Sequence, residues 1–410
     1  MPALFDELTR NVRIAHFTLG RCSPESANGV DKAVYHLARS QAALGHDVAV
    51  FSLTEKAPVP IPGVTVSTCA PLRLPLRFLP DRYYDLLVTR APWNVPRQLV
   101  EQITAWHPDV LHLHFVHIPP NVFLARRLSP TIPYCVTIHG GLSPVAQKRN
   151  RLTKRVFRAL FERQYLQRAA FLHAISELDV QGLGFYGVTN TTILAPNGIE
   201  VDAIVSPTVD MVPDEVKDRI NGRRIFLFLG RLDPEQKGLD LLLKAFAACR
   251  PLDAALVLVG PNWRGAQRHL ETLARSLGIA DAVIFTGPAF GQRKIDLLRA
   301  THVFVHPSRW EAGVPFSVLE AAALARPCLL STAADPAGIL GRNGAAVCVE
   351  PTIEAIAEGL SQLSATSSDA LRELGVRARE LVMREFSWSR TAGVLIDAYR
   401  THVVARAARG

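Results

Sequence analysis

Short apolar runs alternate with amphipathic stretches along this chain, and the alternation occurs twice. Because each run is apolar at consecutive positions, we expect parallel strands that are covered by helices on both faces. The first series begins with Arg13–Thr18, and apolar residues then recur at helical spacing from about Gly29 to Leu44. The pattern restarts after Gly198, with Arg224–Leu229 as its first strand. The sequence therefore predicts an α/β protein with two units.

Further strands are predicted wherever such a run recurs. In the first unit these are Asp47–Leu53, Val110–His114, Tyr134–Ile138, Phe171–Ile175 and Thr191–Leu194, and in the second Ala254–Val259, Ala282–Phe285, His302–His306 and Pro327–Leu330. A helix is expected over Leu239–Ala248, and Glu200–Asn221 is expected to be the linker. We interpret the whole as two Rossmann-like domains that face each other across a cleft, with the carboxyl ends of both sheets lining it.

Composition excludes several classes of protein. A length of 410 residues suggests two domains, and the six cysteines form no CxxC pair, so they predict neither a zinc site nor a disulfide framework. The charged N-terminus does not resemble a signal peptide, and no apolar run approaches the roughly 18 residues that a membrane span needs. We expect a soluble, cytoplasmic protein.

The segment Pro307–Leu330, PSRWEAGVPFSVLEAAALARPCLL, places two carboxylates on either side of a Gly/Pro turn. Pro315 suits the first position of a helix, and Glu320 lies just over one turn into that helix. Unpaired N–H groups at a helix start favour a phosphate, and the carboxylates of Glu311 and Glu320 can accept hydrogen bonds from sugar hydroxyls. The segment therefore predicts a site for a sugar attached to phosphate.

A second loop in this unit carries two cations. Gly230–Gly238, GRLDPEQKG, follows the strand Arg224–Leu229, so Arg231 and Lys237 are expected at a strand's carboxyl end, where they can neutralise a diphosphate. Two solvated surface cations are the alternative interpretation. Their position in a loop that enters a helix favours the phosphate role.

Two loops of the first unit are also candidates. His139 ends a strand beside Gly140 and Gly141, and could hydrogen-bond a substrate hydroxyl, whereas a structural histidine is the alternative. The loop SANGV contains Gly29 at a helix start, which permits a ligand to approach the backbone but equally suits a plain tight turn. The loop does not match GxGxxG, so it gives no support for a dinucleotide cofactor.

His112 and His114 lie on one side of a predicted strand, a spacing that could hold a metal ion. No acidic residue stands nearby in the sequence, and packed core positions explain the pair more simply. We therefore predict no metal site.

The segment Lys148–Arg168 has eight cations and one acid, Glu162, with apolar residues at helical spacing. Attraction to an anionic membrane surface or an anionic acceptor is one interpretation, and a merely solvated helix face is the other. Nucleic acid is not expected, because no aromatic interleaving or known module accompanies the charge.

Together these motifs resemble glycosyltransferase family 4, whose members are retaining enzymes of the GT-B fold. The resemblance rests on NGVDKAVYHLA, PDVLHLH, TIHG, AISE, PNGI, GRLDPEQKG, PSRWEAGVPFSVLEA and FSWSR, in the family's order. It implies an N-terminal Rossmann-like acceptor domain over residues 1–200, a C-terminal nucleotide-sugar donor domain over 201–385, and a C-terminal helix over 386–410 that crosses back to the first domain.

The resemblance also implies roles for side chains. Arg231 and Lys237 would bind the donor diphosphate, Glu320 the ribose hydroxyls and Glu311 the donor sugar, while His139 would meet that sugar near its reacting end. The remaining implied donor contacts come from backbone, and they are Gly29, Gly230, Gly287 to Ala289, Gly313 and Val314.

Two departures from the family pattern stand out. Eight residues separate Glu311 from Glu320, where the family usually has seven, so we expect a one-residue bulge beside Gly313. Ala325 replaces the glycine of the family's GxP turn, which we expect to be a minor packing change.

The predicted activity is transfer of a hexose-type sugar from a nucleotide diphosphate sugar to a sugar or lipid-linked acceptor hydroxyl, without metal or other cofactor. Cell-surface polysaccharide or glycolipid biosynthesis is the expected setting, in the cytoplasm or peripherally on the inner face of the membrane. A sugar-nucleotide epimerase of GT-B fold and a catalytically degenerate, membrane-associated binding protein are the alternatives.

Overall fold

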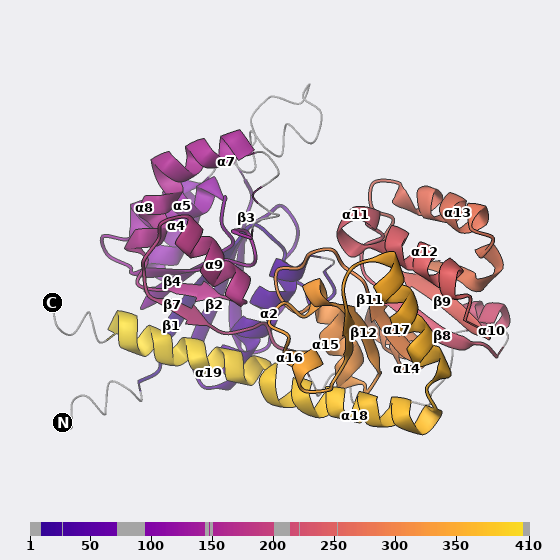
Figure 1. The fold of residues 1–410 in the computed structure, drawn as a ribbon. Coiled ribbons are helices and arrows are strands. Elements are labelled where there is room, and N and C mark those ends of the chain that lie inside the picture. The colour runs from indigo at the N-terminus through magenta and orange to yellow at the C-terminus, as the bar shows by residue number, and fades with distance from the viewer. Residues whose placement is uncertain are drawn as a thin grey trace. The chain divides into compact units, whose positions relative to one another are not determined.

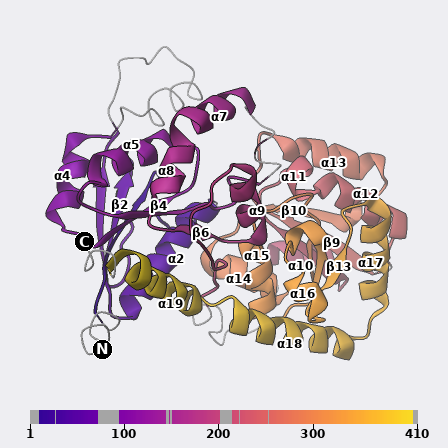
Figure 2. The same ribbon diagram turned by 60° about the vertical axis from the view of Figure 1, so that its left-hand side comes forward.

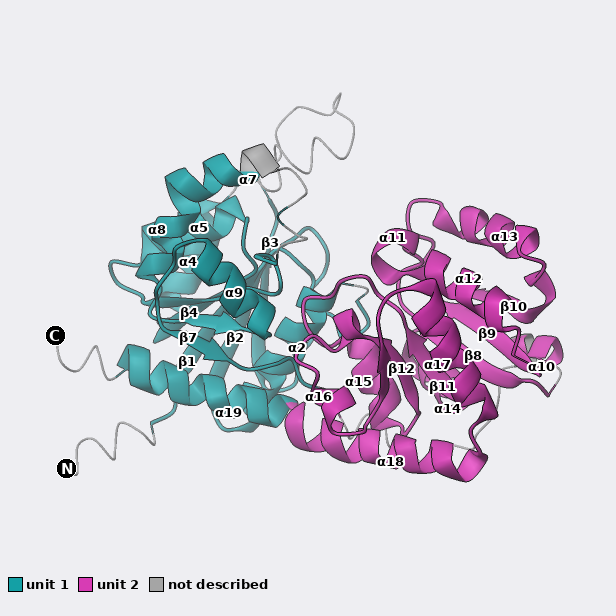
Figure 3. Cartoon of the chain, in the orientation of Figure 1, with its two compact units in different colours: residues 1–198, 388–410 teal, residues 199–387 magenta. Residues whose placement is uncertain are grey.

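A computed structural model describes residues 10–26, 28–71, 95–143, 147, 151–200, 214–220, 222–251 and 253–404. The chain divides into two compact units (Figure 3). Unit 1 combines Met1–Gly198 with the C-terminal segment Trp388–Gly410, and unit 2 is Ile199–Ser387. Each unit is built on its own sheet.

Unit 1 contains a seven-stranded sheet in the order β3-β2-β1-β4-β5-β6-β7, with parallel pairing throughout. Its strands are β1 (Arg13–Thr18), β2 (Asp47–Leu53), β3 (Val64–Cys69), β4 (Val110–His114), β5 (Tyr134–Thr137), β6 (Leu172–Ala174) and β7 (Thr192–Leu194). All the predicted strands of this unit are present. The sequence missed β3, whose residues are mostly half-buried and whose apolar pattern is weaker.

The C-terminal helix α19 (Trp388–Tyr399) runs along one edge of unit 1 (Figure 1). Other helices of this unit are α2 (Gly29–Ala43), α4 (Arg97–Ala105), α5 (Pro119–Leu128), α7 (Arg151–Phe157), α8 (Arg163–Arg168) and α9 (Glu177–Phe185), with π-helical turns at Arg158–Glu162 and Arg400–Val404. Asn28 caps α2 by accepting a hydrogen bond from Val30 N. The C-terminal α19 packs against α2, and Thr391 Oγ1 donates to Pro196 O at 2.7 Å.

Unit 2 contains a six-stranded parallel sheet in the order β10-β9-β8-β11-β12-β13. The strands are β8 (Arg224–Leu229), β9 (Ala254–Val259), β10 (Val283–Gly287), β11 (Val303–His306), β12 (Cys328–Ser331) and β13 (Val347–Val349). The predicted strands are present, with bounds that differ by one or two residues, and β13 was not predicted.

Helices α12 and α17 of unit 2 pack against each other (Figure 2). The helices are α10 (Asp214–Ile220), α11 (Pro234–Lys237), α12 (Leu239–Cys249), α13 (Ala266–Ser276), α14 (Gly291–Arg299), α15 (Phe316–Ala323), α16 (Ile339–Arg342), α17 (Ile353–Ala365) and α18 (Ser368–Glu385). The expected linker was therefore wrong over its last part, since α10 occupies it and buries Val216 and Ile220 in the core of unit 2.

The two sheets differ in what their faces carry. In unit 2, Phe226 and Phe228 enter one hydrophobic core while Ile225 and Leu227 enter another, so alternate residues of β8 supply apolar side chains to both faces. In unit 1, Leu111 and Leu113 of β4 enter an apolar core, but the alternate residues of that strand include His112 and His114. The other face of the unit 1 sheet thus carries buried polar side chains as well as apolar ones.

Ala325 adopts a left-handed backbone conformation, with φ of +56°. The turn joins α15 to β12, and a Cβ on the neighbouring Gly375 would lie 2.0 Å from Ala325 O. A side chain in this conformation is strained. Our expectation of a minor packing change was wrong, because the missing glycine alters backbone strain.

No helix in the described part of the chain combines the length and the apolar character needed to cross a bilayer.

Candidate active site

Two loops meet at the carboxyl ends of β8 and β11 in unit 2. Gly238, with φ of +65°, closes the first loop, and a Cβ there would lie 2.1 Å from Pro307 O in the second. Arg309 ties the loops together, because its guanidinium forms a bidentate ion pair with Asp240 at 2.7 Å and its Nη1 also donates to Pro234 O. The sequence motifs Gly230–Gly238 and Pro307–Leu330 therefore form one site.

Lys237 and Glu311 form a buried ion pair at the centre of this site, 2.5 Å apart. The same carboxylate oxygen, Glu311 Oε1, also accepts from His306 Nε2 at 3.0 Å and from Ser308 Oγ at 2.5 Å. Burial would raise the pKa of Glu311, but the charge of Lys237 and the hydrogen bonds from His306 and Lys237 outweigh it and lower that pKa to about 2. Glu311 is therefore ionised.

The extra residue between the two acids does not remove Glu311 from this cluster. Gly313 is absent from the residues with positive φ, so the segment between Glu311 and the start of α15 reaches the observed geometry without a left-handed glycine there. Gly313 and Val314 lie in this segment, directly before Pro315, the N-cap of α15. Gly313 therefore does not use the left-handed conformation that glycine tolerates, and the one-residue bulge beside it stays a prediction.

Glu320 lies in α15 and is paired with Lys294 of α14, with 2.8 Å between Nζ and Oε1. Both side chains are mostly buried. The sequence analysis did not single out Lys294, because nothing in a helix sequence indicates which neighbouring helix it will face. The pair gives unit 2 a second buried contact between a lysine and a carboxylate, in addition to that of Lys237 with Glu311.

Arg231 follows β8 and is positioned by two neighbours. Its Nη2 donates to Gln236 Oε1 at 2.9 Å, and its guanidinium lies 4.4 Å from the ring centre of Trp263. The adjacent loops approach closely, because a Cβ on Gly260 would lie 1.7 Å from Gly230 O. Trp263 was missed, as a single tryptophan in a loop carries no readable signal.

Gly287 ends β10 with φ of +72°, and no atom within 4 Å would meet a Cβ placed on it. The side of Gly287 that a Cβ would occupy is therefore open. The contact of Gly287–Ala289 with a nucleotide base stays a prediction.

The predicted site residues of unit 1 are Gly29 and His139, and they follow β1 and β5. His139 has φ of +53° and precedes Gly140, whose N donates to Asp179 Oδ1 at 2.9 Å. Burial raises the pKa of Asp179 to about 7, against hydrogen bonds from Ile175 N and Gly140 N that lower it. Gly29 begins α2 without positive φ, beside the capping side chain of Asn28.

His139 belongs to a group of buried histidines. Its Nε2 lies 3.0 Å from His114 Nδ1, and His114 Nε2 lies 2.9 Å from His16 Nδ1. His112 stacks on His114, with 4.4 Å between the ring centres. The sequence pointed to His112 and His114 as core residues, and both are buried. It gave no indication that His16 would join them.

Nitrogens of His16, His112 and His114 lie within 4.8 Å of one another, a separation that could suit a metal ion. Both ring nitrogens of each residue are nevertheless within hydrogen-bond distance of another side chain. A metal ion would have to displace these bonds. The absence of a metal site remains a prediction.

The basic segment predicted at Lys148–Arg168 lies partly outside the described residues, because Lys148 and Arg149 are not among them. Its single acid, Glu162, is fully buried and contacts His117 Nδ1 at 2.8 Å. A π-helical turn, Arg158–Glu162, carries it. The acid therefore does not offset the basic charge at the surface.

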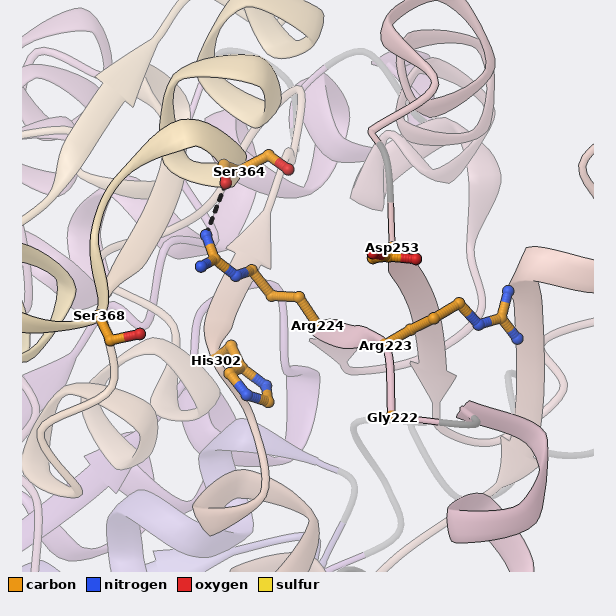
Figure 4. Close-up of a pocket in the computed structure, with 7 residues that line it drawn as sticks. All are labelled: Gly222, Arg223, Arg224, Asp253, His302, Ser364 and Ser368. Carbon is orange, nitrogen blue, oxygen red and sulfur yellow. Dashed lines mark hydrogen bonds between the residues drawn. The ribbon is translucent and has the colours of Figure 1, made fainter.

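A further pocket of about 450 Å³ lies at the opposite ends of the unit 2 strands and is lined by Arg223, Arg224, His302 and Ser364 among others (Figure 4). Arg224 Nη1 donates to three carbonyl oxygens, those of Leu363, Ser364 and Thr366. Arg224 thus caps the C-terminus of α17, and it belongs to the scaffold rather than to the site.

Two family models match most of this chain. Residues 28–198 match a "Glycosyl transferase 4-like domain", and residues 223–366 match "Glycosyl transferases group 1". The two matches fall in units 1 and 2, respectively.

Similar curated proteins carry transferase names. A phosphatidyl-myo-inositol mannosyltransferase of Mycobacterium leprae is 26% identical over 382 residues, which cover 91% of this chain and 93% of the relative. A D-inositol 3-phosphate glycosyltransferase of Gordonia bronchialis is 30% identical over 272 residues, which cover 62% of this chain and 57% of the relative.

Solved structures show a shared fold. Sucrose-phosphate synthase of Thermosynechococcus elongatus has a TM-score of 0.75 at 21% identity, covering 97% of this chain and 100% of that one. Anabaena HepE in complex with UDP and glucose has a TM-score of 0.70 at 15% identity, and the match covers 94% of this chain and 98% of HepE. The predicted GT-B fold is confirmed.

Proposed function

Because this chain belongs to the group 1 glycosyltransferases of family 4, we propose that it transfers a hexose-type sugar from a nucleotide diphosphate sugar to an acceptor hydroxyl, with retention of anomeric configuration. The observation that carries this proposal is the meeting in unit 2 of the loops of Arg231, Lys237 and Glu311, directly before the helix that holds Glu320. The cations suit a diphosphate, and the carboxylates suit hydroxyl groups.

Arg231 and Lys237 stabilise the departing diphosphate in this proposal. Both follow β8 at its carboxyl end, and Arg231 is held by Gln236 and Trp263. Fixed cations at the point where negative charge develops lower the barrier without reorganising during the reaction. Because these cations and the start of α15 supply positive charge, we expect activity to persist in the presence of a chelator such as EDTA.

Glu311 accepts hydrogen bonds from the donor sugar. Its Oε1 already receives three hydrogen bonds, whereas its Oε2 has no hydrogen-bond partner among the residues that the structure describes. The free lone pairs of Oε2 suit a sugar hydroxyl. Backbone N–H groups of Gly313 and Val314 assist, and Glu320 binds the ribose while also contacting Lys294.

His139 contacts the sugar near its reacting end, and Gly29 allows the diphosphate to approach the backbone at the start of α2. Solved structures of Anabaena HepE, which shares this fold, hold UDP or UDP-glucose. We therefore place UDP-sugars first in a donor screen, followed by GDP- and ADP-sugars.

The first test is a thermal-shift screen with these nucleotide sugars, followed by turnover assays with the stabilising donor. We expect Arg231→Ala to lower kcat/KM by about 100-fold, which corresponds to the loss of one transition-state contact. Gln292→Ala, a substitution on α14 outside the site, is the control. Turnover close to wild type in Arg231→Ala would contradict the proposed diphosphate site.

The acceptor is proposed to be a sugar or a lipid-linked polyol, in cell-surface polysaccharide or glycolipid synthesis. The name of the Mycobacterium leprae relative includes phosphatidyl-myo-inositol, a lipid whose headgroup is a polyol. The transferase names of the relatives and family models do not favour the epimerase alternative.

We also propose that α7 and α8 bring unit 1 to an anionic membrane surface. Val156, Leu160 and Phe161 are 50%, 61% and 40% exposed, amid Arg155 and Arg158. Exposed apolar side chains within a basic helix are typical of helices that lie in a lipid interface.

Vesicle co-sedimentation tests this surface. Binding should require anionic lipid and weaken with salt, and the double substitution of Leu160 and Phe161 by serine should lower it. Phe185→Ser is the control, since Phe185 is 79% exposed on α9. Equal binding to neutral vesicles, or an equal loss in the control, would contradict the proposal.

A further inference from the structure

A continuous chain of hydrogen bonds crosses the polar face of the unit 1 sheet and ends at His139. It consists of eight hydrogen bonds that join, in order, Ala195, His173, Thr137, His112, Tyr399, Gln41, His16, His114 and His139. The side chains come from β1, α2, β4, β5, β6 and α19, and all but the last are at most 3% exposed. His139 itself is 9% exposed.

One end of this chain has a fixed direction. His173 Nε2 lies 2.8 Å from Ala195 O, and a carbonyl oxygen only accepts, so this nitrogen carries the proton. In the neutral ring, His173 Nδ1 is then an acceptor, and Thr137 Oγ1 donates to it at 2.8 Å. Thr137 has a single proton to give, so its oxygen accepts from His112 Nε2 at 2.6 Å.

The same reasoning carries through α19 and α2. His112 Nδ1 must accept, and Tyr399 OH donates to it at 2.6 Å. The tyrosine oxygen therefore accepts from Gln41 Nε2 at 3.2 Å, which also fixes the orientation of that amide. Gln41 Oε1 in turn accepts from His16 Nε2 at 2.7 Å.

The last two hydrogen bonds reach the candidate active site. His16 Nδ1 accepts from His114 Nε2 at 2.9 Å, and His114 Nδ1 accepts from His139 Nε2 at 3.0 Å. Every donor in the chain thus points toward Ala195, and all five histidines carry their proton on Nε2. Hydrogen bonds that share one direction polarise and strengthen one another.

We propose that this chain fixes His139 as the neutral Nε2–H tautomer, so that its Nδ1 only accepts hydrogen bonds, and that Tyr399 and Gln41 are positioning residues for it. The inference deepens the proposed function, on which it rests: His139 would receive a hydrogen bond from a donor-sugar hydroxyl and would give none. His139 is therefore excluded as the acid of the reaction.

Burial supports neutral rings along the chain. It lowers the pKa of His16 and His173 to about 4 and that of His139 to about 3, and it brings His112 and His114 well below their usual range. Hydrogen bonds to Gln41 and Ala195 act in the opposite direction on His16 and His173 and are outweighed. A protonated ring would also have two donors and would break the common direction.

NMR of the full chain with ¹⁵N-labelled histidine tests the tautomers directly at pH 7.5, with signals assigned by comparison with His139→Ala. We expect neutral Nε2–H rings at His139 and at the four histidines behind it. A proton on Nδ1 of His139, or an imidazolium among the five, would overturn the inference. So would a stoichiometric shift of the His16, His112 and His114 signals on addition of Zn²⁺, because the nitrogens would then be ligands.

A double-mutant cycle tests whether Tyr399 acts through His139. We expect Tyr399→Phe to lower kcat/KM for the donor between about twofold and about tenfold, the range for one neutral hydrogen bond, and to cause no further loss in a His139→Ala background. Tyr134→Phe is the control, because its buried hydroxyl donates to Tyr165 O in the same unit but outside the chain. An equal loss in both backgrounds, or none in either, would overturn the positioning role.

A second pair of variants keeps the test independent of Tyr399. Thr137→Val breaks the chain at a single hydroxyl, and Thr137→Ser retains that hydroxyl. We expect a mixture of His139 tautomers in the first variant and the wild-type tautomer in the second, and identical spectra would count against the chain. If no nucleotide sugar supports transfer, the proposed function fails, whereas the NMR result still decides the tautomer.

Discussion

The two units hold their candidate site residues in different ways, one by ion pairs and the other by neutral hydrogen bonds. In unit 2 the central side chains are charged and paired, as in Lys237 with Glu311 and Lys294 with Glu320. In unit 1, His139 is held by neutral groups that share one hydrogen-bond direction. Both arrangements are largely buried, so the main difference between them lies in charge and not in exposure.

This difference in charge corresponds to the part of the ligand that each unit is proposed to bind. A diphosphate carries charge, and cations that are fixed in place before the reaction stabilise it. A sugar hydroxyl is neutral, and a fixed acceptor selects its orientation without the cost of burying a charge. The comparison therefore predicts that the two units respond differently to pH and to substitution.

The largest expected effect is a loss of stability of unit 1 in mild acid. Burial lowers the pKa values of the five histidines in the hydrogen-bond chain. Below about pH 6.5 the unfolded protein therefore binds more protons than the folded protein. Each group then removes about 1.4 kcal/mol per pH unit, and Asp179, with a raised pKa, offsets one of them. We expect unit 1 to lose roughly 5 kcal/mol between pH 6 and pH 5.

Hydrogen exchange measured by mass spectrometry, corrected for the intrinsic pH dependence, can follow each sheet separately. We expect β1 and β4 to lose protection before β8 and β9, because Glu311 withdraws its stabilisation only between about pH 4.5 and its folded pKa of about 2. His302 and His306 have pKa values that are lowered by burial and act in the same direction in unit 2, but they are two groups against five. An equal loss of protection from exchange in both sheets would contradict this difference between the units.

The next effect concerns the ion pair of unit 2. Lys237→Met leaves the carboxylate of Glu311 buried without its cation, and we expect a loss of about 3 kcal/mol in the free energy of unfolding. Adding Glu311→Gln should recover much of this loss, because the unpaired charge is then removed. Urea denaturation at pH 7.5 measures both variants, and a double variant no more stable than the single one would show that charge is not the cause.

Much of this architecture could be predicted from the sequence. Parallel strands such as β8 and β9 are apolar at consecutive positions because both faces are buried, and that pattern is local. The loops with Arg231, Lys237, Glu311 and Glu320 could also be placed, since they follow such strands or begin a helix. These are features that a short segment carries by itself.

The partners of the site residues could not be predicted, for a physical reason. Lys294 contacts Glu320 across two helices, and Tyr399 contacts His112 over 287 positions in the sequence. Such contacts depend on which helix covers which strand, and a helix sequence shows that it has a buried face without showing what it buries that face against. His16 was missed for the same reason.

The smallest expected effect concerns a turn of unit 2 that lies outside the candidate site. Ala325 has φ of +56° in the turn after α15, and glycine adopts this conformation without strain. We expect Ala325→Gly to raise the free energy of unfolding by about 1 kcal/mol and to leave kcat/KM unchanged. Calorimetry checks the first expectation, and a lower melting temperature would show that the turn is not strained.

Calorimetric titration with nucleoside diphosphates tests most directly whether charge in unit 2, and not the neutral site of unit 1, holds the donor diphosphate. Wild type, Arg231→Ala and His139→Ala are each titrated with UDP, GDP and ADP. We predict that one nucleotide binds, that Arg231→Ala weakens it at least tenfold, and that His139→Ala binds it as wild type does. Binding that is lost in His139→Ala but retained in Arg231→Ala would contradict the account.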